Sequence, residues 1–69
     1  MKVGDIVRLH RWETKPYGRI LRRDAMLRDY WVIEYNYGKY GNGLVAIQEA
    51  FFTLITDPAT QVAVALALG

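Results

Sequence analysis

The chain has 69 residues, 52% of them hydrophobic and 23% charged, which is the composition of one small globular domain rather than of a disordered segment. It has no cysteine, so disulfides and thiolate metal sites are excluded. No run approaches the roughly 20 apolar residues of a membrane span, and the amino terminus lacks the apolar core of a signal peptide. We therefore expect a soluble protein without membrane contact, in the cytoplasm or in a soluble assembly such as a virion.

The net charge of +2 is unevenly distributed along the chain. Residues 1–28 carry eight lysines and arginines against three carboxylates, whereas residues 29–69 carry one lysine against four carboxylates. Such an asymmetry can mark a face for an anionic partner, although a set of solvated strand and loop charges gives the same pattern.

Short segments rich in β-branched and aromatic residues alternate with turn signals, which is the pattern of an all-β domain. We expect strands over residues 5–10, 18–23, 30–35, 44–48 and 52–55, with one helical turn over 49–51. Gly18, at the start of the second strand, predicts a sharp bend or a close approach of the backbone. The inward-facing residues of the first and third strands are then Val7, Leu9, Trp31, Ile33 and Tyr35.

Residues 57–69 differ in character from the rest. Asp57 and Pro58 make a good helix opening, as N-cap and first helical residue. The segment that follows alternates large and small apolar side chains, so it is either a strand with one large-residue face or a helix that is apolar all round. We predict that it packs on a partner or on a second copy rather than on its own domain. The predicted contact residues are Val62, Val64, Leu66 and Leu68.

The connection over residues 36–43 is rich in turn formers, and its three glycines supply positive φ angles. Two tyrosines lie within it, Tyr37 and Tyr40. We expect both to project outwards and to join the partner contact.

Four segments together have the order of a known fold. They are Val3-Gly4-Asp5-Ile6-Val7, Gly18-Arg19-Ile20, Tyr30-Trp31-Val32-Ile33-Glu34-Tyr35 and Phe52-Thr53-Leu54-Ile55. In this order they resemble SH3-like β-barrels of the KOW and Tudor kind, and small SH3-like accessory subunits of photosynthetic and redox complexes look similar. The resemblance implies a five-stranded SH3-like barrel over residues 1–56, followed by the tail over 57–69 as a short helix or an extended segment.

The sequence contains few residues that could act in catalysis. There is no serine or cysteine nucleophile, and the one histidine, His10, has no second histidine to share a metal. The glycines at 38–43 are not followed by a phosphate-loop Lys-Ser/Thr. We therefore predict no enzyme activity, no catalytic residue, no metal and no cofactor.

A basic and aromatic surface is the remaining candidate for a ligand. Arginines neutralise phosphates and aromatic rings stack on bases, so these residue types suit RNA or DNA. The candidate contacts are Arg8, Trp12, Tyr17, Arg19, Arg22 and Arg23. Our leading hypothesis is nevertheless a non-enzymatic protein–protein interaction module, either a homo-oligomer or a small structural or accessory subunit of a larger assembly. The alternative is a KOW-like nucleic-acid-binding module that uses this arginine-rich face.

Overall fold

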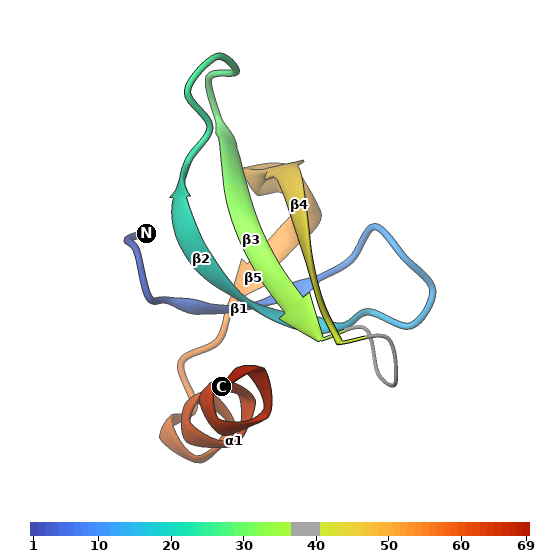
Figure 1. The fold of residues 1–69 in the computed structure, drawn as a ribbon, viewed down its shortest axis with the longest axis vertical. Helices are drawn as coiled ribbons and strands as arrows, with labels where there is room; N and C mark the ends of the chain where they lie inside the picture. Colours follow the sequence, from blue (N-terminus) through green and yellow to red (C-terminus); the bar gives the residue numbers. More distant parts are fainter. Residues whose placement is uncertain (37–40) are drawn as a thin grey trace.

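The computed structural model describes residues 1–36 and 41–69, which form five antiparallel strands and one short C-terminal helix (Figure 1). The elements are β1 (Ile6–Leu9), β2 (Tyr17–Arg23), β3 (Tyr30–Asn36), β4 (Asn42–Gln48), the 3-10 turn η2 (Glu49–Phe51), β5 (Phe52–Leu54) and α1 (Pro58–Leu68). The predicted all-β class, with five strands and the helical turn, is confirmed, and of the two alternatives for the tail the structure has the helix. The strand ends lie within two residues of the predicted ones.

The strands form one sheet in the order β4-β3-β2-β1-β5, and the sheet curls strongly around its inner face (Figure 1). The register between β2 and β3 shifts between Ile20 and Arg22, and such a bulge increases local twist and bend. The buried core on the inner face is made of Val7, Leu9, Ile20, Trp31, Ile33, Ile47 and Phe52. Tyr35 packs against its edge, so the predicted inward faces of the first and third strands are confirmed.

Gly18 lies where β2 passes close to β3. It is buried and pairs with Tyr35 in the sheet register. A Cβ atom at this position would lie 2.5 Å from Cγ2 of Ile33 and 2.8 Å from the backbone oxygen of Glu34. The predicted close approach of the backbone is therefore present, and only glycine fits it.

The tail is a helix, and its start has the predicted cap. The Asp57 carboxylate accepts hydrogen bonds from the hydroxyl of Thr60 at 2.6 Å and from the backbone N–H of Thr60 at 2.9 Å. These two bonds favour the charged carboxylate and so lower the pKa of Asp57 below its ordinary value of 3.8. The cap and Pro58 in the first turn select the helix over the strand.

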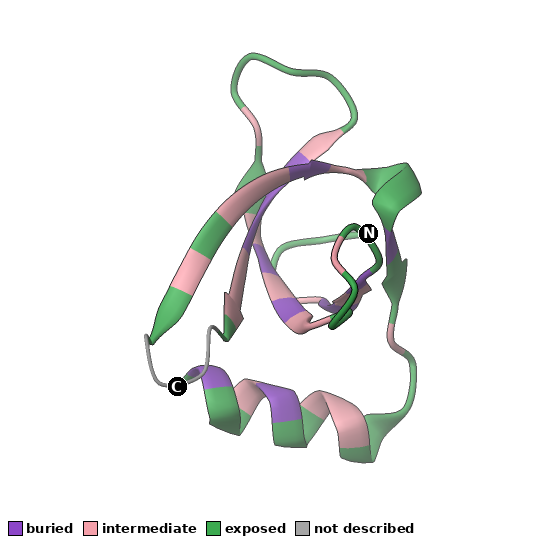
Figure 2. Ribbon diagram, turned by 90° about the vertical axis from the view of Figure 1, so that its right-hand side faces the viewer, coloured by how far each residue is buried: buried purple, intermediate pink, exposed green. Residues whose placement is uncertain are grey.

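One side of α1 packs on the outer face of the sheet. Val64 and Leu68 are buried against Ile6, with Tyr17 and Ile55 at the margin, and this contact forms a second apolar cluster (Figure 2). The expectation that the tail packs on a partner rather than on its own domain is therefore wrong for Val64 and Leu68. The physical reason is that Ile6 of β1 points to the outer face of the sheet, where packing against Val64 and Leu68 removes its apolar surface from water.

Polar side chains from the sheet hold the last turn of α1. The backbone oxygen of Leu68 accepts a hydrogen bond from Nδ2 of Asn42 at 2.7 Å. Arg19 pairs with Glu34 at 2.9 Å and also donates to the backbone oxygen of Gly69 at 3.2 Å. The carbonyl groups that a helix leaves unpaired at its C-terminal end thus find donors on β2 and β4. The orientation of α1 is fixed by this polar contact as well as by the apolar one.

Candidate protein-interaction face

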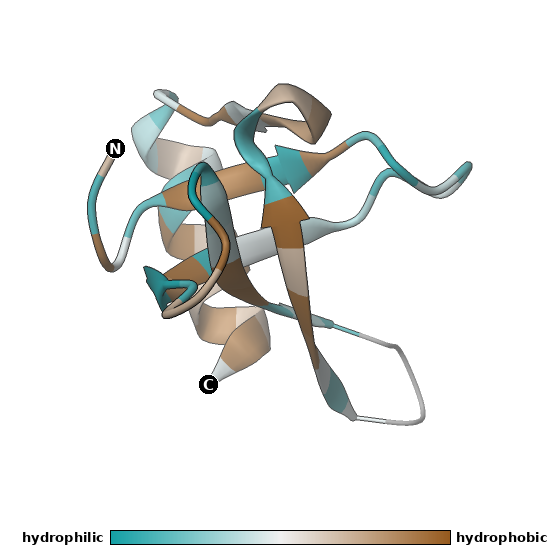
Figure 3. Ribbon diagram, turned by 90° about the horizontal axis from the view of Figure 1, so that it is seen from above, coloured by the Kyte–Doolittle hydropathy of each residue, from teal (hydrophilic) through white to brown (hydrophobic). Residues whose placement is uncertain are grey.

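The side of α1 that faces away from the sheet is apolar and open. Val62 and Leu66 form a ridge on it, and their exposed fractions are 60% and 77%. The helix has 11 residues and none of them is charged. Figure 2 shows exposed segments repeating along the outer side of α1, and Figure 3 shows hydrophobic colouring in its second half, toward the C-terminus. We call the exposed residues Ala59, Val62, Ala63, Leu66 and Ala67 the α1 face.

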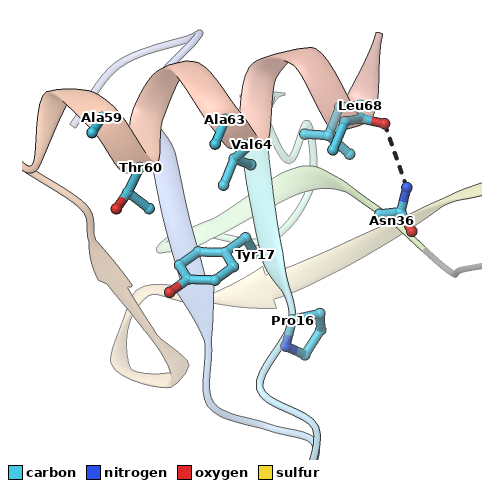
Figure 4. Close-up of a pocket in the computed structure, with 9 residues that line it drawn as sticks. Pro16, Tyr17, Asn36, Ala59, Thr60, Ala63, Val64 and Leu68 are labelled. Atoms are coloured by element: carbon cyan, nitrogen blue, oxygen red, sulfur yellow. Dashed lines mark hydrogen bonds between the residues drawn. The ribbon is translucent and has the colours of Figure 1, made fainter.

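A groove runs beside this face, between α1 and the start of β2. It has a volume of about 550 Å³ and is almost entirely apolar. Its walls include Ala59, Ala63 and Ala67 on the helix. The opposite wall is Tyr17, at the start of β2, with Pro16 just before it (Figure 4). Because alanine side chains are short, they leave the groove open where larger residues would fill it.

A second hollow lies next to the groove and shares Pro16 and Asn36 with it. It has a volume of about 510 Å³ and contains the rings of Trp12 and Tyr35. The ring centroids are 5.2 Å apart, with an angle of 31° between the planes. Both rings also pack against the main core, so they are held in place rather than free at the surface.

The six residues of the predicted nucleic-acid face lie in three different places. Arg8 lies 5.1 Å above the ring of Tyr17, beside α1, and its Nε donates to the backbone oxygen of Lys15 at 3.2 Å. Arg19 is engaged by Glu34 and by the end of α1. Trp12 belongs to the hollow described above.

Arg22 and Arg23 lie at the end of β2 that leads away from α1. Arg22 pairs with Val32 in the register, and Arg23 lies 4.6 Å above the ring of Trp31. The indole N–H of Trp31 in turn donates to Glu49 at 2.8 Å. Arg22 and Arg23 are exposed, whereas Arg8 and Arg19 are partly buried. The nucleic-acid role of the six residues stays a prediction, but the structure does not gather them into one surface.

The predicted partner contacts are also divided. Val62 and Leu66 point outwards, whereas Val64 and Leu68 are part of the protein's own core. Tyr37 and Tyr40 lie outside the described residues. The groove itself was not predicted from the sequence, and neither were Pro16 and Tyr17 as its walls. A signal for the helix side was present, because alanines at positions 59, 63 and 67 are spaced so that a helix places them along one side.

Within residues 1–36 and 41–69, no three His, Asp or Glu side chains lie close enough together to hold a metal ion. The same residues include no helix of the length and apolarity needed to cross a membrane. His10 interacts with the hydroxyl of Thr53, on the neighbouring strand. Compared with protein-family models, curated proteins and solved structures, the chain matches none. The proposals below therefore depend on the geometry alone.

Proposed function

We propose that this chain is a non-enzymatic protein-interaction module, a small structural or accessory subunit of a larger assembly, which docks through the α1 face and the adjoining groove. The observation that carries the proposal is the uncharged helix at the surface with Val62 and Leu66 exposed on it. The solvent side of a surface helix is normally polar or charged. A contiguous apolar face beside a groove is instead typical of an interaction site.

The chemistry of the face favours a protein over a charged ligand. Its ridge and groove offer apolar contact and one aromatic wall, Tyr17, with few polar groups to bind phosphate or carboxylate. Arg8 stacks on the ring of Tyr17, and arginine and tyrosine are residue types that often dominate binding energy between proteins. The partner is therefore expected to present apolar side chains to the groove.

The scaffold is proposed to be an SH3-like barrel of the KOW or Tudor kind. The support is the order of five antiparallel strands, the helical turn before the closing strand and the tight approach at Gly18. In this proposal the barrel serves as a rigid support, and the helix outside it supplies the contact.

The proposal is tested with the fluorescent apolar-surface probe bis-ANS on dilute protein. Leu66→Lys is expected to lower the bound emission several-fold, because it places a charge in the middle of the α1 face while keeping a good helix former. The matched control is Met26→Lys, because Met26 is 89% exposed and lies in the turn between β2 and β3, away from α1. Emission that falls equally in both variants, or no binding of the probe to wild type, would refute the proposed face.

A second proposal, the KOW-like nucleic-acid module, now rests on Arg22 and Arg23, because these two arginines are exposed. Two phosphate contacts predict a plot of log affinity against log salt with a slope of only about −2, and weak binding. We expect anisotropy titrations with mixed-sequence RNA and DNA to give dissociation constants above roughly 10⁻⁶ M at physiological salt. Binding of this strength that is lost in Arg22→Ala and Arg23→Ala would support the nucleic-acid module, whereas no binding, or binding unchanged in these variants, would refute it.

A further inference from the structure

We propose that the partner of the α1 face is a second copy of this chain, related to the first by a two-fold axis. This inference rests on the proposed function and names its partner. In the dimer, the ridge of Val62 and Leu66 on one copy lies in the groove between α1 and Tyr17 of the other copy. The reciprocal contact is made at the same time.

The first support is the position of the ridge relative to the groove. Both lie on one helix, and the stripe of Ala59, Ala63 and Ala67 separates the ridge from the opening beside Tyr17. A two-fold axis that passes between a knob and an adjacent hole places each knob in the hole of the other copy. The contact is then closed, with no ridge or groove left over to bind a third copy.

The second support is the size of the side chains. Helices pack by inserting the ridges of one into the grooves of the other, and short side chains allow the closest approach. The alanine stripe provides that approach on α1, while Val62 and Leu66 provide the volume to be inserted. The groove of about 550 Å³ has room for such apolar side chains.

The third support is electrostatic. Residues close to a two-fold axis face their own copies, so any charged residue there faces a like charge and is repelled. Between Pro58 and Gly69 the chain has no charged side chain. When the two helices are antiparallel, their dipoles also oppose each other favourably. An uncharged helix is therefore compatible with self-association in a way that a charged surface helix is not.

The extent of the face sets the expected strength of the dimer. The face is about one helix wide, so the area buried in the dimer lies at the small end of the range for protein–protein interfaces. Association is weak at that size and depends on concentration. Small domains also commonly gain stability by association. We therefore expect monomer and dimer to exchange as protein concentration changes.

The first measurement is sedimentation velocity over about 5 to 500 µM protein, where mass action shifts the equilibrium. Wild type and the control Met26→Lys are expected to change from monomer to dimer over this range. Leu66→Lys is expected to weaken association at least about tenfold, because it buries an unpaired charge in the apolar groove of the other copy. Circular dichroism confirms that each variant keeps its fold.

The second measurement uses the absence of cysteine from the chain. Ala63 is exposed in the alanine stripe between the ridge and the groove, next to the proposed axis. Mild oxidation of Ala63→Cys is expected to give a covalent dimer, because a disulfide needs Cα atoms within about 7 Å. The control Met26→Cys is expected to stay mostly monomeric under the same conditions.

The outcomes separate this inference from the proposed function. Wild type that stays monomeric at every concentration, with no faster cross-linking of Ala63→Cys than of Met26→Cys, overturns the two-fold dimer. If bis-ANS binding in that monomer is still sensitive to Leu66→Lys, the α1 face remains a docking surface for a different protein. If the probe also fails to bind, both proposals are refuted.

Discussion

Leu68→Ala is expected to lower the free energy of unfolding by about 3 kcal/mol, as is typical for removing a buried leucine side chain. Leu68 is 6% exposed and packs in the cluster that joins α1 to Ile6 on the outer face of the sheet. Its backbone oxygen also accepts the hydrogen bond from Asn42. The substitution therefore leaves a cavity beside the last turn of α1, and loosening this turn uncovers the apolar surface of β1.

The measurement is urea unfolding followed by tryptophan fluorescence and circular dichroism. Leu66→Ala is the matched control, because it makes the same chemical change two residues away on the exposed side of the same helix. The control is expected to change the free energy of unfolding by less than about 0.5 kcal/mol in dilute, monomeric protein. Equal losses in the two variants would show that α1 is not docked as described.

Gly18→Ala is expected to cost about 3 kcal/mol, at the upper end of the range for overpacking a core. The added methyl group would lie 2.8 Å from the backbone oxygen of Glu34 as well as against Ile33. A backbone oxygen in the middle of a sheet cannot move aside without separating β2 from β3. The expected result is therefore a large loss from the addition of a single carbon atom.

Gly43→Ala is the matched control for this substitution. Its Cβ would also be crowded, at 2.9 Å, but by the ring of Tyr35 rather than by backbone. The Tyr35 ring lies at the edge of the core and can shift slightly more readily than a strand backbone can, so we expect a loss of only about 1 kcal/mol in the same urea experiment. A loss in Gly43→Ala as large as that in Gly18→Ala would contradict the difference between rigid and adjustable neighbours.

The inward-facing residues of the sheet could be predicted because successive side chains of a strand point to opposite faces. Val7 and Leu9 face inwards for that reason alone, as do Trp31 and Ile33. The tail was ambiguous because its large and small residues alternate with a period of two while all are apolar. The cap at Asp57, followed by Pro58 in the first turn, resolves that ambiguity in favour of the helix.

The face that α1 turns to the sheet could not be predicted from the tail itself. In a helix that is apolar all round, the sequence has no polar side to mark the solvent, so Val62 and Val64 are equivalent candidates for burial. The choice is made by the sheet, where Ile6 and Val7 are adjacent in one strand and both buried. Two successive buried residues in a strand mean that both faces of the sheet are covered there. The signal in the sequence is that Ile6 and Val7 are successive apolar residues in a predicted strand.

The six residues of the predicted nucleic-acid face lie apart in the structure for a related reason. Arg19 faces Glu34 because the register of β2 and β3 aligns these two residues, and the register follows from the whole sheet. The bulge near Ile20 then changes how the residues after it are presented, so Arg22 and Arg23 do not continue the surface of Arg8 and Arg19. Sequence spacing alone contains neither the register nor the bulge.

The main proposal is that α1 packs on the sheet with one side and binds a partner with the other. Its most direct test is bis-ANS emission from dilute wild type, Leu66→Lys and Leu68→Ala measured side by side. We expect Leu66→Lys to lose most of the emission, whereas Leu68→Ala keeps or increases it because loosening α1 uncovers more apolar surface. Emission from Leu66→Lys equal to that of wild type would contradict the claim.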